Sequence, residues 1–115
     1  FYSSLPRCDF LGLLKHCGIL VGNSSSGIAE ASYFSIPVVN IGIRQFGRER
    51  GTNVIDVKEF KSKEIEKSIR KGLKKKNEHK LVRNSLYGNG NTSKQIMKIL
   101  QKPLSKDLIQ KHISY

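Results

Sequence analysis

The sequence predicts an α/β fold with a mostly parallel β-sheet and helices on both of its faces. Three short apolar runs have the composition of buried strands, at residues 18–22, 37–41 and 53–57. Each run is followed by polar or helical sequence, and this alternation is typical of parallel sheets. With 115 residues, the chain has the size of one domain.

The first expected helix covers residues 6–17, where apolar side chains recur at helical intervals. Pro6 suits a first helical turn, and Gly18 suits the position just past a helix end. The run 18–22 is continuously apolar and bounded by glycines, which predicts a strand that is buried on both faces.

A polar turn at 23–27 leads into a second expected helix at 28–34. The next two strands are β-rich, and Pro37 is tolerated because it stands at the first position of its strand. Ser62 begins an amphipathic helix that carries lysines late, at 74–76, as the helix dipole prefers.

A last helix is expected after Asn91 or Thr92, either of which suits an N-cap, and Pro103 should end or kink it. We therefore expect a domain at residues 1–102 and a helical tail at 103–115. Because apolar segments begin at once after Phe1, we also expect the sequence to be part of a longer protein.

The net charge of +12 attracts polyanions such as nucleic acid, anionic membranes or phosphorylated ligands. Between Lys58 and Arg83, however, lysines alternate with acidic and apolar residues, which favours a solvated helix face. Cys8 and Cys17 form no CxxC pair, so they are interpreted as reduced thiols. No apolar run approaches the roughly 20 residues of a membrane span. We expect a cytoplasmic protein with no membrane partner.

The turn after residue 22, Gly22-Asn23-Ser24-Ser25-Ser26-Gly27, joins a buried strand to a helix. Free backbone N–H groups and the hydroxyls of Ser24 and Ser25 should converge there and bind an anion. A helix N-cap without a ligand is the alternative. Glu30 would repel a phosphate, but its carboxylate suits the vicinal hydroxyls of a ribose, unless it is simply solvated.

The loop after residue 41, Gly42-Ile43-Arg44-Gln45-Phe46-Gly47-Arg48-Glu49-Arg50, falls at the same predicted edge of the sheet. Arginine grips phosphate oxygens in a forked geometry, so this loop is a second candidate element of an anion site. One ligand would not require all three arginines. Some are expected to face solvent or a partner domain.

These motifs together give a specific resemblance. The stretch 22–57 resembles hydrolysing UDP-N-acetylglucosamine 2-epimerases, and Tyr87-Gly88-Asn89-Gly90-Asn91 resembles a YGDG element of hydrolysing and non-hydrolysing members, with Asn89 in place of the usual Asp. The resemblance implies a Rossmann-like domain that forms the carboxy-terminal, UDP-binding half of a GT-B-type enzyme of two domains.

Transferred to this sequence, the resemblance implies that Ser24 and Ser25 bind the diphosphate, Glu30 the ribose, and Arg44 a neighbouring part of UDP. Leu5 would approach the uracil with Phe10 nearby, although Phe10 is equally suited to the core. No residue matches the catalytic groups of the family, which lie chiefly in the amino-terminal half and at the hinge. The resemblance suggests no metal or organic cofactor.

The implied partners are a UDP-sugar substrate, the amino-terminal half of the enzyme, and further copies of the whole enzyme in a homo-oligomer. The implied reaction converts UDP-N-acetylglucosamine and water into N-acetylmannosamine and UDP, in sialic acid or related biosynthesis. Three alternatives remain: a non-hydrolysing 2-epimerase, half of a UDP-sugar glycosyltransferase, and a basic nucleic-acid-binding module. A related bacterial branch acts on UDP-diacetamido sugars.

Overall fold

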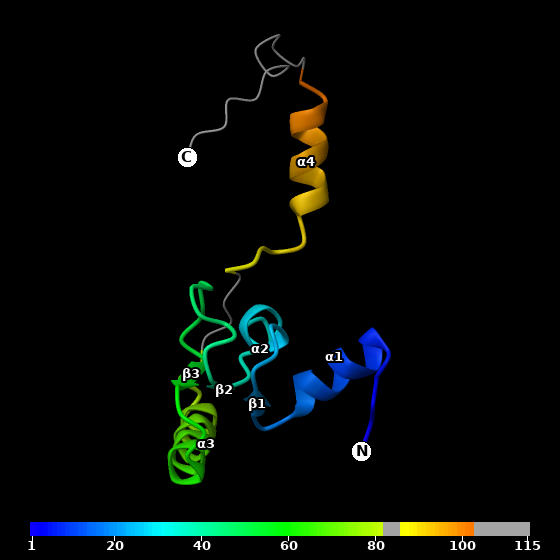
Figure 1. The fold of residues 1–115 in the computed structure, drawn as a ribbon. Helices are drawn as coiled ribbons and strands as arrows, with labels where there is room; N and C mark the ends of the chain where they lie inside the picture. The colour runs from blue at the N-terminus through cyan, green and yellow to red at the C-terminus, as the bar shows by residue number, and fades with distance from the viewer. Residues whose placement is uncertain (82–85, 103–115) are drawn as a thin grey trace.

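The computed structural model describes residues 1–81 and 86–102, and it contains a three-stranded parallel sheet (Figure 1). The strand order is β1-β2-β3, so β2 lies in the centre. The strands are β1 (Leu20–Gly22), β2 (Val38–Ile41) and β3 (Val54–Val57). The predicted α/β fold with a parallel sheet is confirmed, and each strand lies inside its predicted run.

Four helices accompany the sheet in the described part of the chain: α1 (Arg7–His16), α2 (Ser26–Ala29), α3 (Ser62–Asn77) and α4 (Thr92–Leu100). Asn91, one of the two predicted candidates, is the N-cap of α4, whereas Pro6, predicted for the first turn of α1, lies one position earlier at its N-cap. The expected tail at 103–115 lies outside the described residues.

Helix α2 differs from its prediction, because it starts two residues before Ile28 and ends after about one turn. The N–H of Ala31 bonds five residues back to the carbonyl of Ser26 (2.9 Å), and the N–H of Tyr33 bonds three residues back to the carbonyl of Glu30 (3.1 Å). The segment closes at Ser35, whose φ of 55° is left-handed. The predicted helix at 28–34 is therefore wrong beyond Ala29, where irregular turns replace it.

Ser35→Gly should raise the free energy of unfolding by about 0.5–1 kcal/mol. A left-handed conformation costs a residue with a Cβ about 1–2 kcal/mol, and part of the gain is lost to the greater freedom of glycine in the unfolded chain. Urea denaturation followed by circular dichroism measures the change. Ser3→Gly, in the exposed segment before α1, is the control, and a lower midpoint for Ser35→Gly would contradict the expectation.

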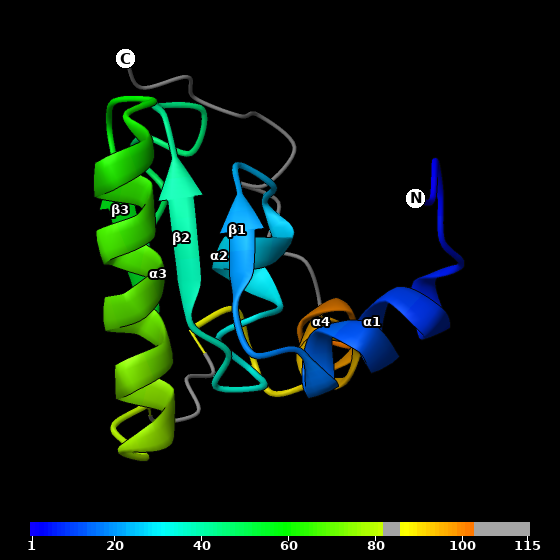
Figure 2. The same ribbon diagram turned by 90° about the horizontal axis from the view of Figure 1, so that it is seen from below.

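The register of the strands separates the two faces of the sheet. Leu20, Val38 and Val54 are aligned on one face, whereas Val21, Val39 and Ile55 are aligned on the other. A Cβ at Gly27 of α2 would lie 2.8 Å from Val38, and a Cβ at Gly72 of α3 would lie 3.7 Å from Ile55. Helices α2 and α3 therefore pack on opposite faces, as Figure 2 shows.

The hydrophobic core lies on the α2 side of the sheet. Leu14 of α1 contributes to it together with Ala31, Ile36 and Val38, each at most 3% exposed. Phe10, Cys17, Leu20, Phe34 and Val54 pack against this cluster. Helix α1 is thus tied to the sheet through one apolar edge, and the rest of α1 is solvated.

Helix α3 carries ion pairs along its exposed surface. Arg70 bonds to Glu66 (2.8 Å), and Glu78 pairs with both Lys74 and Lys80. The hydrogen bond from Lys80 lowers the pKa of Glu78. These contacts agree with the prediction of a solvated helix face. Helix α4 stands apart from the sheet, and no helix in the described ranges is long and apolar enough to span a membrane (Figure 1).

Candidate functional site

The two loops singled out in the sequence meet at the carboxyl edge of the sheet. The side-chain amide of Gln45 donates a 2.7 Å hydrogen bond to the carbonyl oxygen of Asn23, and Nη1 of Arg44 lies 3.4 Å from the same oxygen. The expectation that they share one edge is confirmed. Because all three strands are parallel, their carboxyl ends present both loops on the same side.

The serine turn uses the hydroxyl of Ser24 within the fold but leaves two backbone N–H groups available. Oγ of Ser24 accepts a bond from the N–H of Ser26 (3.3 Å) and donates to the Ser26 hydroxyl (3.2 Å). Among the described residues, the backbone N–H groups of Ser24 and Ser25 donate to no other group. Since α2 is only one turn long, these N–H groups, rather than a helix dipole, would supply most of the attraction for an anion.

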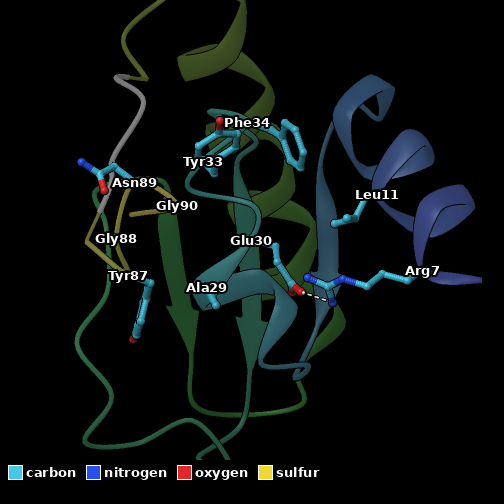
Figure 3. Close-up of a pocket in the computed structure, with 10 residues that line it drawn as sticks. All are labelled: Arg7, Leu11, Ala29, Glu30, Tyr33, Phe34, Tyr87, Gly88, Asn89 and Gly90. Atoms are coloured by element: carbon cyan, nitrogen blue, oxygen red, sulfur yellow. Dashed lines mark hydrogen bonds and ion pairs between the residues drawn. The ribbon is translucent and has the colours of Figure 1, made fainter. Parts of the chain in front are cut away.

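Glu30 follows α2 directly and points toward α1 (Figure 3). Its Oε1 lies 3.2 Å from Nη1 of Arg7, and the side chain of Glu30 is 26% exposed. The second carboxylate oxygen has no partner among the described residues. Glu30 therefore keeps acceptor capacity in a half-buried position next to a cation.

A cavity of about 470 Å³ adjoins Glu30 and Arg7 (Figure 3). It is lined on α1 by Leu11, beyond Glu30 by Tyr33 and Phe34, and on the far side by the 87–90 segment. The hydroxyl of Tyr87 donates to the carbonyl oxygen of Glu49, which links this segment to the arginine loop. A hollow with aromatic and apolar walls and one carboxylate suits a ligand that combines hydroxyls with a flat ring.

The three arginines of the loop have different environments. Arg50 is engaged within the fold, because its guanidinium contacts Asp56 (2.5 Å) and the carbonyl oxygens of Gln45 (2.6 Å) and Arg48 (3.1 Å). Arg44 faces the serine turn, while Arg48 is exposed. Of the three, Arg44 has the position that suits a contact with an anion bound at Ser24.

Leu5 and Phe10 lie away from the serine turn. Leu5 lines a separate hollow with Tyr2, Cys8 and Leu13, on the outer side of α1. Phe10 packs against the core. The structure thus places Arg44 at the start of the serine turn and Glu30 on a cavity that neither serine lines. Leu5 and Phe10 do not line that cavity.

Two site residues were missed from the sequence. No function was predicted for Gln45 of the arginine loop, although a polar residue between the end of a strand and a glycine is a signal for a site residue. Arg7 had no such signal, because its pairing with Glu30 joins residues 23 positions apart. No group of three metal-ligating side chains occurs in the described segments.

Comparisons with known proteins find a matching family model and several similar proteins. Residues 1–101 match the family model described as UDP-N-acetylglucosamine 2-epimerase. The chain is 38% identical over 112 residues to a UDP-N,N'-diacetylbacillosamine 2-epimerase (hydrolyzing) of Legionella pneumophila, covering 96% of this chain and 29% of that protein. It is 43% identical over 56 residues to a UDP-N-acetylglucosamine 2-epimerase of Neisseria meningitidis, covering 49% of this chain and 15% of that protein.

A third relative is a GDP/UDP-N,N'-diacetylbacillosamine 2-epimerase (hydrolyzing) of Campylobacter jejuni, 46% identical over 55 residues. That match covers 48% of this chain and 14% of the relative. The chain thus spans less than a third of the length of the relatives it matches.

Proposed function

The chain belongs to the UDP-N-acetylglucosamine 2-epimerase family, and from this premise we propose that it is the UDP-binding domain of a hydrolysing 2-epimerase. In this proposal residues 1–102 form the Rossmann-like, carboxy-terminal half of a GT-B-type enzyme. The amino-terminal half faces it across a cleft, and the whole enzyme is a homo-oligomer.

The observation that carries the proposal is that hydrogen-bond donors and acceptors are separated within the seven residues 24–30. Ser24 and Ser25 offer backbone N–H donors, and Ser25 also a hydroxyl, that suit a diphosphate, while Glu30 offers acceptors that suit ribose hydroxyls. This order matches UDP, in which the diphosphate is joined directly to the ribose. Arg44 lies on the diphosphate side of this arrangement.

The proposed reaction of the whole enzyme is elimination of UDP from UDP-N-acetylglucosamine, followed by addition of water to release N-acetylmannosamine. Negative charge grows on the departing diphosphate as its bond to the sugar breaks. Donors fixed at Ser24, Ser25 and Arg44 would stabilise that charge in the transition state. The groups that move the proton at C2 are proposed to lie in the rest of the enzyme.

A second substrate, a UDP-diacetamido sugar, is favoured by one observation. The relative that matches 96% of this chain carries the diacetylbacillosamine name. Both substrates share UDP, so the same serine turn and Glu30 would serve either. Assay of the complete enzyme with both sugar nucleotides separates the two candidates by their ratio of kcat/KM.

Two alternative functions would require different features of the site. A UDP-sugar glycosyltransferase half would use the same ribose contact, but the family match favours an epimerase. A nucleic-acid module would need a continuous basic surface, whereas acidic residues interrupt that of α3 by pairing with Arg70 and Lys74.

UDP added to the ¹⁵N-labelled chain should shift the amide resonances of Ser24, Ser25 and Glu30, with a dissociation constant near 1 mM. The proposed facing domain contributes no contacts in this experiment, so the affinity corresponds to only about −4 kcal/mol. Uridine should shift Glu30 but leave Ser24 and Ser25 unchanged, because it has no phosphates.

Ser24→Ala is the variant for this titration, with Ser93→Ala on the distant α4 as its control. Only Ser24→Ala should weaken the binding of UDP. Shifts confined to α3 or α4, or an equal response of both variants, would contradict the proposed site.

A further inference from the structure

The carbonyl oxygen of Asn23 is held by the neighbouring loop, immediately before the serine turn. Gln45 Nε2 donates to it at 2.7 Å, and Gln45 as a whole is only 3% exposed. Arg44 approaches the same oxygen more loosely, at 3.4 Å and from an exposed position. Gln45 is therefore the principal group that fixes the orientation of this carbonyl.

Fixing the carbonyl of Asn23 also fixes the N–H of Ser24. The two groups belong to one planar trans peptide, in which C=O and N–H point in opposite directions. With its carbonyl turned toward the Gln45 amide, this peptide turns the Ser24 N–H away from the Gln45 side chain. That N–H donates to no other group in the described part of the chain.

We propose that Gln45 is a positioning residue that aims the Ser24 N–H at the diphosphate of the ligand. The inference rests on the proposed function for the identity of that ligand. Without the bond from Gln45, the peptide between Asn23 and Ser24 can rotate. Its carbonyl would then be free to turn toward the anion and repel it.

Gln45 is itself held by the strands. Nη2 of Arg50 donates to the carbonyl oxygen of Gln45 (2.6 Å), and Nη1 of Arg50 contacts Asp56 of β3 (2.5 Å). The side chain of Asn40 on β2 donates to the same Asp56 oxygen (2.7 Å). A continuous set of contacts therefore joins the two strands to the peptide that precedes Ser24.

A purely structural role explains Gln45 poorly. Its Oε1 is buried with no hydrogen-bond partner among the described residues. A buried acceptor without a partner is unfavourable, so an apolar side chain of similar volume would fill the same space at less cost. The amide is accounted for by the bond that it donates to Asn23.

The test is Gln45→Met, which keeps the volume and removes the donor, with Gln45→Leu as a second variant in case the methionine side chain packs badly. Dissociation constants for UDP, inorganic pyrophosphate and uridine are measured by NMR titration of the chain. We expect about tenfold weaker binding of UDP and pyrophosphate, unchanged binding of uridine, and an unfolding midpoint no lower than that of the parent chain.

The outcomes separate this inference from the proposed function. If the parent chain binds UDP through Ser24 and both variants bind it equally well, the role of Gln45 is overturned while the UDP site stands. A parallel loss of uridine binding and stability would show a structural role and overturn it as well. A parent chain that binds neither UDP nor pyrophosphate overturns both ideas.

Discussion

Gly27→Val should destabilise the domain by about 3 kcal/mol. A Cβ at Gly27 would lie 2.8 Å from Cγ1 of Val38 and 3.5 Å from Leu20. Val38 is 2% exposed on the central strand and has a stiff, branched side chain, so it cannot move aside. Overpacking of this kind costs about 1–3 kcal/mol, and the branched methyls of valine add to the clash.

Urea denaturation followed by circular dichroism measures the effect of Gly27→Val. Gly12→Val is the matched control, because a Cβ at this exposed position of α1 meets no atom within 4 Å. It should change stability by less than about 0.5 kcal/mol. Equal stability of the two variants would mean that α2 does not pack closely on β2. Gly27→Val should also weaken UDP binding, because the displaced turn includes Ser24 and Ser25.

Glu30→Gln should weaken UDP binding by about ten- to a hundredfold. The substitution keeps the shape of the side chain but removes the charge from the proposed hydrogen bond to a ribose hydroxyl, and such a charge-assisted bond contributes about 1.5–3 kcal/mol. The variant also loses the ion pair with Arg7. That pair is largely solvent-exposed on the Arg7 side, so its loss should change the free energy of unfolding by less than about 1 kcal/mol.

A double comparison isolates the ribose contact. The affinities of the parent chain and of Glu30→Gln are measured for UDP and for 2′,3′-dideoxy-UDP, with Glu64→Gln on α3 as a control for the change in charge. The defect of Glu30→Gln should disappear with the dideoxy nucleotide, which has no hydroxyls for Glu30 to bind. An equal defect with both nucleotides would place Glu30 away from the ribose.

Local sequence patterns were sufficient to predict most of the secondary structure. The apolar runs at 18–22, 37–41 and 53–57 each contain a strand, because continuous apolar sequence is stable only where both faces of a strand are covered. The two ends of α1 were also predicted from local signals, Pro6 and Gly18. The end of α2 was not, since the packing of Ala31 and Ile36 against the core replaces regular helical bonds with turns.

The positions of the two candidate loops also followed from the sequence, because parallel strands place their carboxyl ends at one edge. The roles of individual side chains within those loops did not follow. Arg44 and Arg50 are the same residue type in one loop, yet Arg50 is engaged with Asp56 while Arg44 faces the serine turn. Phe10, a candidate neighbour of uracil, packs against the core.

The sequence by itself thus determined the order of the elements and the edge of the sheet that carries the serine turn and the arginine loop. Only the tertiary structure decided which groups meet: the Gln45 amide with the Asn23 carbonyl, Arg7 with Glu30, and Arg50 with Asp56. The physical reason is the distance along the sequence between the residues that interact. Strand and helix periodicity is set by neighbours a few residues apart, whereas two of these three contacts join residues that are 22 and 23 positions apart and depend on how whole elements pack.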